Sequence, residues 1–444
     1  MNDKADAFDL PDTPAGRQLG WWIGMLNREG EGAGPADWNR YAPELRARFE
    51  PLPDAEGQVA AWRANAGRVG RVTEVVVEAG GDFEIKVAAR TAKERGWTID
   101  VAVEPEPPHR MTRFQIERRH DFELGFREAT AADAAILADI ERRCPIVMGD
   151  VSVHFDRGDD YMAATRLMED CSIGLASVDG VPAAVSCGAV HVVRIGGVLK
   201  NLLTVSHLRV LPEHQRKGLW GEANRILDKY RGRTDGSNAY ISVDNLGMQH
   251  GFANTPNKWP QTIDRVVLDC AALAGPPAGR PATPADVEAI VARLNAFHDA
   301  EEMFVPYTPA SFGERMRRAA DLYAWDRVWL TDGALVGAWA HGNALRAVTV
   351  SAGVRTVSIS GVVLDYAFQP GAEAAFEALL RAWCGRLAAE GVDSLILYTS
   401  PASPGAALIK SLAREVGGFF MWTPGIEVPK GAENRGLYVD AVYF

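Results

Sequence analysis

The residues best suited to chemistry form one short basic loop, Gln215-Arg216-Lys217-Gly218-Leu219-Trp220-Gly221. An apolar, β-branched run precedes the loop at 198–211, Pro212 ends that run, and a helical pattern follows at 222–230. The pattern predicts a buried strand, a stop, the loop and then a helix start. The first turn of a helix has unpaired backbone N–H groups and partial positive charge, so this order is typical of a phosphate-binding site.

Two features of the loop suit a polyphosphate. Gly218 and Gly221 lack a Cβ and therefore let a ligand approach the backbone closely. Arg216 and Lys217 can add positive charge, although their side chains can equally be solvated on the surface. The alternative interpretation is a plain strand, turn and helix that carries basic surface residues.

The loop lies inside an internal repeat with a spacing of 153 residues. Arg-Glu-Ala-Thr-Ala-Ala-Asp at 127–133 is matched by Arg-Pro-Ala-Thr-Pro-Ala-Asp at 280–286. Each copy predicts the end of a strand, a Thr N-cap and the start of a helix. The same spacing relates Asp179-Gly180 to Asp332-Gly333, and both dipeptides lie between apolar runs, where they predict hairpin turns.

This repeat predicts the domain organisation. We expect two copies of one α/β domain at 125–273 and 279–444, joined by a Gly/Pro-rich linker at 274–279. Residues 1–120 do not repeat, and their order of helices followed by strands resembles a cystatin-like or NTF2-like α+β domain. The helical patterns of this part lie at 13–28, 38–49 and 55–65, and the strand patterns lie at 71–78, 82–90, 97–104 and 111–119.

Composition argues against several classes of protein. The chain has 444 residues and a formal net charge of -11, which disfavours a nucleic-acid partner. Its five cysteines are scattered without a CxxC pair, so we expect neither a disulfide framework nor a metal site. The N-terminus lacks an apolar signal segment and no run of about 18 apolar residues occurs, so we expect a cytoplasmic protein without a membrane partner.

The loop and its strand resemble motif A of the GNAT superfamily of N-acetyltransferases. Val210, Pro212, Gln215 and Gly218 occupy the matching positions of that motif. Trp220 departs from the motif, which usually has Gly or Ala at this position. The fold class that the resemblance implies is α+β, with tandem acyl-CoA N-acyltransferase (GNAT) domains preceded by the small cystatin/NTF2-like domain.

The resemblance also implies how acetyl-CoA, or another acyl-CoA, would bind as co-substrate. The backbone amides of the loop, including that of Leu219, are expected to hold the pyrophosphate. The end of the preceding strand is expected to pair with the pantetheine arm. The strand residues concerned are Leu208, Arg209 and Val210.

A second segment matches the same family. A predicted strand at 239–243 is followed by Asn245 and Phe252, and this order resembles the family's segment beside the pantetheine arm. The family often has Tyr where Phe252 stands, and that Tyr protonates the leaving thiolate. Phe252 has no hydroxyl group, so His250 is our candidate for the acid. A surface histidine on a helix is the alternative interpretation of His250.

Acyl transfer to an amine needs a group that removes a proton from the amine, directly or through water. His207 is our candidate for this base, because it lies three residues before Val210, near the position where the family often has an acidic base. An imidazole pKa near 6.5 suits the task. Asp244 and Glu213 are further alternatives. A histidine that is simply hydrogen-bonded in the core of the strand is the competing interpretation.

The second copy of the repeat lacks the loop. The 153-residue spacing places Phe368, Pro370, Gly371 and Glu373 at the loop positions. Pro370 removes an N–H donor and Glu373 would repel a phosphate, so we expect no cofactor there. The second copy is expected to pack against the first, to shape the substrate site or to form a homodimer.

Three functions remain open on the sequence alone. The leading prediction is an acyl-CoA-dependent N-acyltransferase that passes the acyl group directly to a small-molecule amine. The first alternative is a non-catalytic protein that binds or senses acyl-CoA. The second is a small-molecule binding module in the N-terminal domain, with the tandem unit as its scaffold.

Overall fold

The computed structural model of the chain divides into two compact units, Met1–Phe122 and Glu123–Phe444. The residues that the structure describes are 8–28, 35–47, 69–92, 96–119, 122–148, 150–158, 160–215, 217–245, 248, 258–339 and 346–443.

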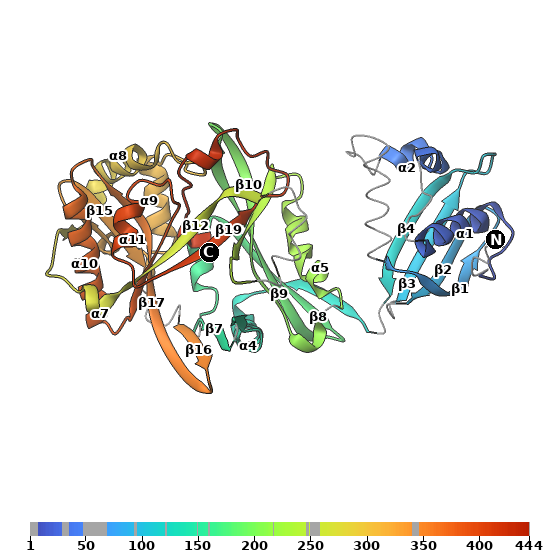
Figure 1. Cartoon of the computed structure of the whole chain (residues 1–444), viewed down its shortest axis with the longest axis horizontal. Coiled ribbons are helices and arrows are strands. Elements are labelled where there is room, and N and C mark those ends of the chain that lie inside the picture. The colour runs from blue at the N-terminus through green and yellow to red at the C-terminus, as the bar shows by residue number, and fades with distance from the viewer. Residues whose placement is uncertain are drawn as a thin grey trace. The chain divides into compact units, whose positions relative to one another are not determined.

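In the first unit, a helix packs on a four-stranded antiparallel sheet (Figure 1). Helix α1 (Pro14–Asn27) begins after Thr13, whose hydroxyl oxygen accepts a hydrogen bond from the amide of Gly16 at 3.1 Å. Its buried face, which includes Leu19 and Ile23, packs on the sheet. The strands in sheet order are β1 (Val72–Gly80), β2 (Glu84–Thr91), β3 (Gly96–Val103) and β4 (Met111–Arg119).

The structure confirms the first predicted helix of this unit and its four predicted strands. In place of the helix predicted at 38–49, the described residues form the 3-10 helix η1 (Pro35–Arg40) and the short helix α2 (Pro43–Ala47). The helix predicted at 55–65 lies outside the described residues.

In the second unit, the described residues form one 15-stranded sheet (Figure 1). The strands of its first half are β5 (Leu124–Glu128), β6 (Ile146–Met148), β7 (Val151–Asp156), β8 (Asp170–Val178), β9 (Val181–Ile195), β10 (Val198–Val210), β11 (Gly236–Ser242) and β12 (Lys258–Asp269). Those of the second half are β13 (Arg280–Pro281), β14 (Val328–Leu330), β15 (Ala334–Trp339), β16 (Arg346–Ser351), β17 (Val354–Phe368), β18 (Ser394–Thr399) and β19 (Glu415–Trp422).

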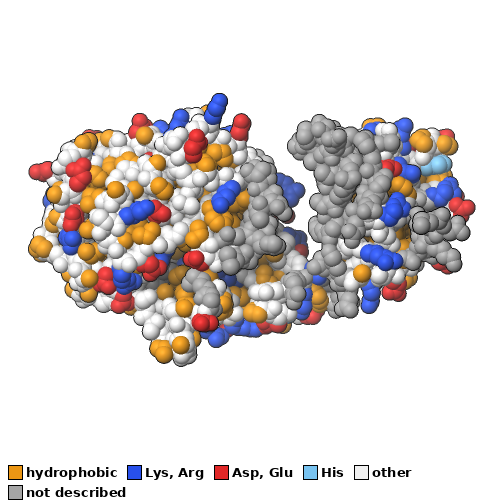
Figure 2. Space-filling view, in the orientation of Figure 1, with side chains coloured by type: hydrophobic (Ala, Val, Ile, Leu, Met, Phe, Trp, Pro, Cys, Tyr) orange, Lys and Arg blue, Asp and Glu red, His pale blue; other side chains and the backbone are white. Residues whose placement is uncertain are grey.

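Helices cover this sheet in both halves. The first half has α4 (Ala134–Arg143), α5 (Leu219–Ala223), the 3-10 helix η5 (Asn224–Tyr230) and α7 (Cys270–Leu273). The second half has α8 (Val287–His298), α9 (Pro309–Arg318), α10 (Glu373–Ala389) and α11 (Ala406–Ser411). The largest helix, α10, buries Phe376, Leu380 and Trp383 in an apolar core against the second half of the sheet. Figure 2 shows acidic and basic side chains interspersed over the visible face of this unit.

The two halves exchange their last strands. The strand order β5-β8-β9-β10-β11 of the first half corresponds to β13-β14-β15-β17-β18 of the second. The last strand of the first half, β12, pairs with β18, whereas the last strand of the second half, β19, pairs with β11. Strands β12 and β19 also pair with each other, as Figure 1 shows at the centre of the unit. The hydrogen bonds of one sheet therefore run through both halves.

A hairpin arm makes a second connection between the halves. Strand β16 pairs with the first part of β17 along one edge and with β7 along the other. Nη2 of Arg346, at the start of β16, lies 2.9 Å from Oδ2 of Asp156, at the end of β7. The second half therefore holds the segment that leads from β7 into Arg157.

The two predicted repeats begin with the same local structure. The guanidinium of Arg127 donates to both carboxylate oxygens of Asp133, at 2.7 and 2.6 Å. That of Arg280 donates to both oxygens of Asp286, at 2.9 and 2.5 Å. Both aspartates also close a capping box with a threonine, and these N-cap residues are Thr130 and Thr283. The local prediction from the sequence is confirmed in both copies.

Both predicted hairpins are also confirmed. Asp179 and Gly180 have φ angles of 50° and 79° and connect β8 to β9 in a tight turn. Asp332-Gly333 connects β14 to β15.

We expect residues 123–278 not to form a stable monomer when they are expressed without the second half. Strand β11 would lose β19, and β12 would lose both of its neighbours, which exposes unpaired strand edges. Size-exclusion chromatography and circular dichroism measure the outcome, and co-expression with residues 279–444 should restore a one-to-one complex. A monomeric first half with a cooperative thermal transition would show that the exchanged strand is dispensable.

Candidate functional site

The candidate site begins where two parallel strands separate. Strands β10 and β11 pair only from Leu202, opposite Gly236, to Thr204, opposite Asn238. Beyond that point β11 continues beside β19, while β10 runs on to Val210 beside β9. Among the described residues, no strand pairs with the other edge of β10 at 205–210. The backbone N–H and C=O groups on this edge can therefore form hydrogen bonds with an extended ligand chain, as they would with a further strand.

A β-bulge marks the same stretch of β10. His207 and Leu208 lie opposite the single residue Ser186, between the regular pairs of Ser206 and Arg209. His207 has a φ angle of 52°, a left-handed conformation that non-glycine residues seldom adopt. Such backbone strain persists where the surrounding structure enforces it, which is common at binding sites.

The basic loop follows directly after this edge. Gly218 has a φ angle of 92° and caps the first turn of α5, which begins at Leu219. A Cβ at Gly221 would meet no atom within 4 Å, so space is open beside the turn. Trp220 is 42% exposed and does not fill the loop from within. This geometry is compatible with a phosphate group at the turn, and phosphate binding there stays a prediction.

Further details of the loop differ from the sequence expectation or lie beyond it. The predicted helix at 222–230 is the end of the short α-helix α5 followed by the 3-10 helix η5. Nζ of Lys217 lies 3.3 Å from Nδ1 of His214. Gln215 ends the turn that follows β10, and Arg216 lies outside the described residues.

A buried polar cluster lies beneath the bulge. Glu141 of α4 is 1% exposed and accepts a hydrogen bond from the hydroxyl of Tyr161 at 2.8 Å. Nη2 of Arg209 lies 3.2 Å from Oε1 of Glu141, and Nε of Arg157 lies 3.8 Å from Oε2. The rings of His207 and Tyr161 are 6.3 Å apart. Helix α4, strand β10 and the segment that follows β7 therefore bring polar and charged groups to the place where β10 loses its partner strand.

Burial and neighbouring charges shift the pKa values of Glu141 and His207 in this cluster. Burial opposes ionisation of Glu141, but Arg209 and Arg157 outweigh it and lower the pKa to about 2. Burial, followed by the charges of Arg157 and Arg209, lowers the pKa of His207 to about 3. At neutral pH the glutamate is therefore ionised and the histidine is neutral. Neither group has the pKa near 7 that suits a general base.

The remaining sequence candidates lie around the strand ends. Oδ1 of Asn245 accepts a hydrogen bond from the amide of Met248 at 3.1 Å, in the turn after β11. The carboxylate of Glu213 pairs with Arg143 on the surface. The amide of Asp244 donates to the hydroxyl of Ser242 at 3.2 Å. His250 and Phe252 lie outside the described residues.

A polar relay that sequence reasoning missed lies at the point of separation. The hydroxyl of Thr204 donates to Oδ1 of Asn238 at 2.6 Å and accepts from Nε2 of His191 at 2.9 Å. The imidazole of His191 also stacks on Tyr443, with ring centroids 3.9 Å apart. Burial lowers the pKa of His191 to about 4. The sequence signal was partial, since Thr204 is a polar residue within the strand pattern at 198–211 and Asn238 directly precedes the one at 239–243.

The equivalent gap in the second half is filled by the chain itself. Strands β17 and β18 pair only from Ser360 to Val362 before they separate. Beyond that point Nε2 of His298, which is 1% exposed, donates to the carbonyl oxygen of Tyr366 at 2.9 Å. The amide of Gly371 donates to the carboxylate of Glu373 at 3.3 Å, where a phosphate would need it. These contacts give a structural reason for the expectation that the second copy holds no cofactor.

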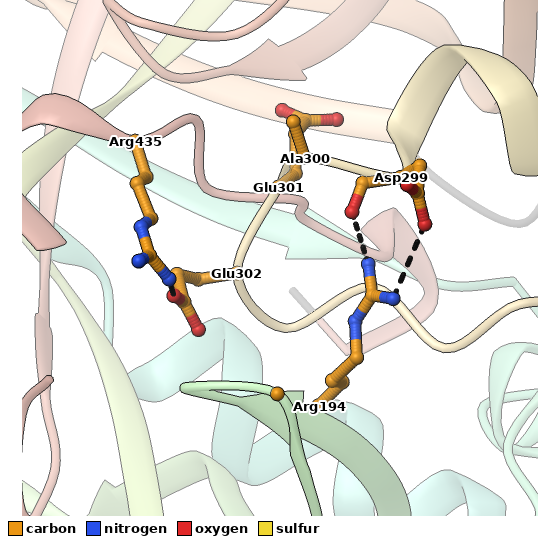
Figure 3. A pocket seen from close by; sticks show the side chains of 7 residues that line it. Arg194, Asp299, Ala300, Glu301, Glu302 and Arg435 are labelled. Atoms are coloured by element: carbon orange, nitrogen blue, oxygen red, sulfur yellow. Dashed lines mark hydrogen bonds and ion pairs between the residues drawn. The ribbon is translucent and has the colours of Figure 1, made fainter.

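A pocket of about 380 Å³ opens at the other end of β10 (Figure 3). Its lining residues are Arg194, Gly197, Asp299, Ala300, Glu301, Glu302 and Arg435. Figure 3 shows Arg194 pointing to Asp299 and Arg435 pointing to Glu302. Nη1 of Arg194 lies 3.3 Å from Oδ1 of Asp299, and Nη1 of Arg435 lies 2.6 Å from Oε1 of Glu302. Strand β10 has 13 residues, so the pocket lies roughly 40 Å from the basic loop. Its charges are paired within the protein, and we assign it to packing of the β9–β10 hairpin.

Two further features bear on ligands. Within the described ranges, no three His, Cys, Asp or Glu side chains are grouped so that they could hold a metal ion. None of the helices that the structure describes is long and apolar enough to cross a bilayer.

The sequence matches no protein-family model and no curated protein. The structure resembles N-myristoyltransferase of Saccharomyces cerevisiae with bound myristoyl-CoA, at a TM-score of 0.51 and 9% identity over 74% of this chain and 86% of that chain. A GCN5-related N-acetyltransferase from Sphaerobacter thermophilus gives a TM-score of 0.42 and 14% identity over 69% of this chain and 98% of that chain. The likeness to N-myristoyltransferase shows that the chain has the GNAT acyl-CoA N-acyltransferase fold, as the sequence predicted.

We expect the stability of the protein to fall as the pH drops from 7 to 5. His191 and His207 have lowered pKa values when folded and values near 6.5 when unfolded. The unfolded chain therefore binds protons below pH 6.5 that the folded chain does not bind, so acid favours unfolding. Thermal unfolding at constant ionic strength measures the effect. The His191→Gln/His207→Asn double variant should have a shallower pH dependence, and an unchanged slope would argue against this assignment.

Proposed function

We propose that this chain is an acyl-CoA-dependent N-acyltransferase that moves an acetyl group from acetyl-CoA to a small-molecule amine. The observation that supports this most is the unpaired edge of β10 at 205–210, directly before the basic loop. An amide-bearing pantetheine arm can pair with that edge. The turn at Gly218 then lies where the pyrophosphate would follow.

In the proposed reaction, the amine nitrogen attacks the thioester carbonyl carbon. The new C–N bond forms, the C–S bond breaks, the sulfur takes up a proton and the nitrogen gives one up. No side chain of the protein bonds to the acyl group, and the strand edge supplies orientation and proximity. Glu141 and His207 have pKa values well below 7, so this proposal assigns neither as the base and passes the proton from the amine to water.

The remaining parts of the proposal concern organisation. We infer that 125–273 and 279–444 are tandem GNAT copies, and that only the first binds acyl-CoA. Residues 1–120 are a cystatin/NTF2-like domain in this proposal, supported by the helix on a four-stranded meander. Five free cysteines favour a reducing compartment such as the cytoplasm. A homodimer through the second copy, with no nucleic-acid or membrane partner, remains part of the proposal.

One observation favours a second candidate function. The cluster beside the free edge contains no group poised to take a proton at neutral pH. A protein that binds or senses acyl-CoA without turnover would need the strand edge and the loop, but not such a group. Binding alone therefore does not separate the two functions, whereas release of the thiol does.

We expect acetyl-CoA to bind to the wild-type protein and to bind about 100-fold more weakly, or not at all, to Gly218→Glu. The new carboxylate would lie where the pyrophosphate is expected and would repel it. Isothermal titration calorimetry measures the affinity. The matched control is Gly371→Glu, since Gly371 has a φ angle of 84° in the corresponding turn of the second half. This control carries the same backbone strain and the same charge, so its affinity should equal that of the wild type.

Release of free thiol from acetyl-CoA in an amine library then tests catalysis. Thiol release with at least one amine, absent in Gly218→Glu and present in Gly371→Glu, would support the transferase. Binding without release across the library would favour the sensing protein. A folded wild type that does not bind acetyl-CoA would overturn both.

A further inference from the structure

Arg157 is a buried cation that makes no hydrogen bond with any residue that the structure describes. Its side chain is 10% exposed, and its Nε atom is buried without a partner. The nearest carboxylate, that of Glu141, lies 3.8 Å away, which is an ion-pair distance rather than a hydrogen bond. A guanidinium has five N–H donors, and buried donors are normally paired. No residue that the structure describes pairs with the buried Nε–H, so this donor is available to a ligand.

The charges around Arg157 do not balance. Glu141 is the only carboxylate that the structure places between Arg157 and Arg209 among the described residues. Its two oxygens are already used by the hydroxyl of Tyr161 and by Nη2 of Arg209. His207 is neutral at pH 7, because its pKa is about 3. The cluster therefore carries one excess positive charge in a poorly solvated place, where an anion is strongly favoured.

The side chain of Arg157 is held in one orientation. Its guanidinium carbon lies 5.5 Å from the ring centroid of Tyr161 and 5.9 Å from that of Phe155. The hydroxyl of Tyr161 is fixed by its hydrogen bond to Glu141. A guanidinium fixed in this way presents a planar fork of donors, which matches the two oxygens of a carboxylate.

The cluster lies beside the proposed point of acyl transfer. Arg209 is the first regular residue of β10 after the bulge, and it belongs to the unpaired edge at 205–210. Its side chain reaches Glu141, which is next to Arg157. An anionic group held by these arginines would therefore lie beside the strand on whose edge the thioester is proposed to bind.

We propose that Arg157, together with Arg209, binds a carboxylate group of a substrate and so positions that substrate for acyl transfer. This inference rests on the proposed N-acyltransferase function and adds the class of substrate. The carboxylate belongs either to the acceptor, as in an amino acid, or to the acyl group, as in a dicarboxylic acid thioester. The binding chemistry is the same in both cases, because a carboxylate binds to the same pair of arginines.

Two pairs of compounds distinguish these sources in the wild-type protein. For the acceptor, thiol release from acetyl-CoA is compared between a set of α-amino acids and the corresponding amino acid amides, which lack the carboxylate. For the donor, calorimetry compares succinyl-CoA with butyryl-CoA, which has the same chain length without the charge. We expect the carboxylate compound to be preferred about 10- to 100-fold in one of the two comparisons.

Substitutions then test whether Arg157 causes the preference for the carboxylate compound. Arg157→Gln should abolish it, and Arg157→Lys, which keeps the charge but loses the fork, should retain only part of it. The matched control is Arg142→Gln, because Arg142 is on the same helix as Glu141 but is 63% exposed and pairs with Asp139. Arg142→Gln should keep the full preference. Thermal unfolding of each variant shows that it is folded.

The outcomes separate this inference from the function on which it rests. Acetyl-CoA binding and thiol release with equal use of acids and amides, and equal affinity for the two thioesters, would overturn the carboxylate site and leave the transferase intact. A preference that survives in Arg157→Gln would also overturn it. Failure of the wild type to bind acetyl-CoA would overturn the proposed function itself. Since the wild-type comparisons need no variant, a misfolded Arg157→Gln protein does not prevent the test.

Discussion

The exchange of last strands is the constraint on which the rest of the second unit depends. Strand β19 pairs with β11 from Ala239 to Ser242, so β11 follows the second half as soon as its short contact with β10 ends at Asn238. Strand β10 meanwhile bends at the bulge that contains His207. The free strand edge thus arises from pairing on the far side of β11. A local loop motif by itself would not create it.

The two halves share one backbone arrangement, a gap between two parallel strands, but differ in the side chains that border this gap. Both contain a parallel pair that separates after three residue pairs, at Thr204 in the first half and at Val362 in the second. In the second half His298 donates a hydrogen bond to the carbonyl oxygen of Tyr366 across the gap. The carboxylate of Glu373 accepts one from the amide of Gly371 in the turn. In the first half no described strand pairs with the corresponding backbone groups at 205–210. A few side chains therefore decide whether the same gap is open or filled.

The sequence predicted the parts of this architecture that depend on neighbouring residues. The Thr130 N-cap, the Asp179-Gly180 hairpin and the turn at Gly218 each involve residues within a short stretch, so composition and spacing determine them. The strand exchange was not predictable in this way. It joins residues far apart in the chain, and the apolar patterns of β12 and β19 fit either neighbour.

The polar groups of the site were predicted less well, for a related reason. Glu141 lies in the last turn of α4, directly before Arg142 and Arg143, so nothing in the sequence marks it as 1% exposed. Its burial depends on Arg209 and Tyr161, which come from a strand and a loop elsewhere. His207 was chosen for the pKa of a free imidazole, but burial and two arginines change that value. Such effects appear only when the elements are assembled.

Through the hairpin arm, the second half helps to position residues of the first half without binding a ligand itself. Strand β16 holds β7 in register up to Asp156, and Arg157 is the next residue. The position of this arginine is therefore set jointly by two segments that are remote in sequence. Protein engineers who randomise only the residues near the basic loop would leave this control of the position of Arg157 unchanged. A library that also varies the arm at 346–351 changes the backbone position of Arg157 while it keeps the guanidinium group.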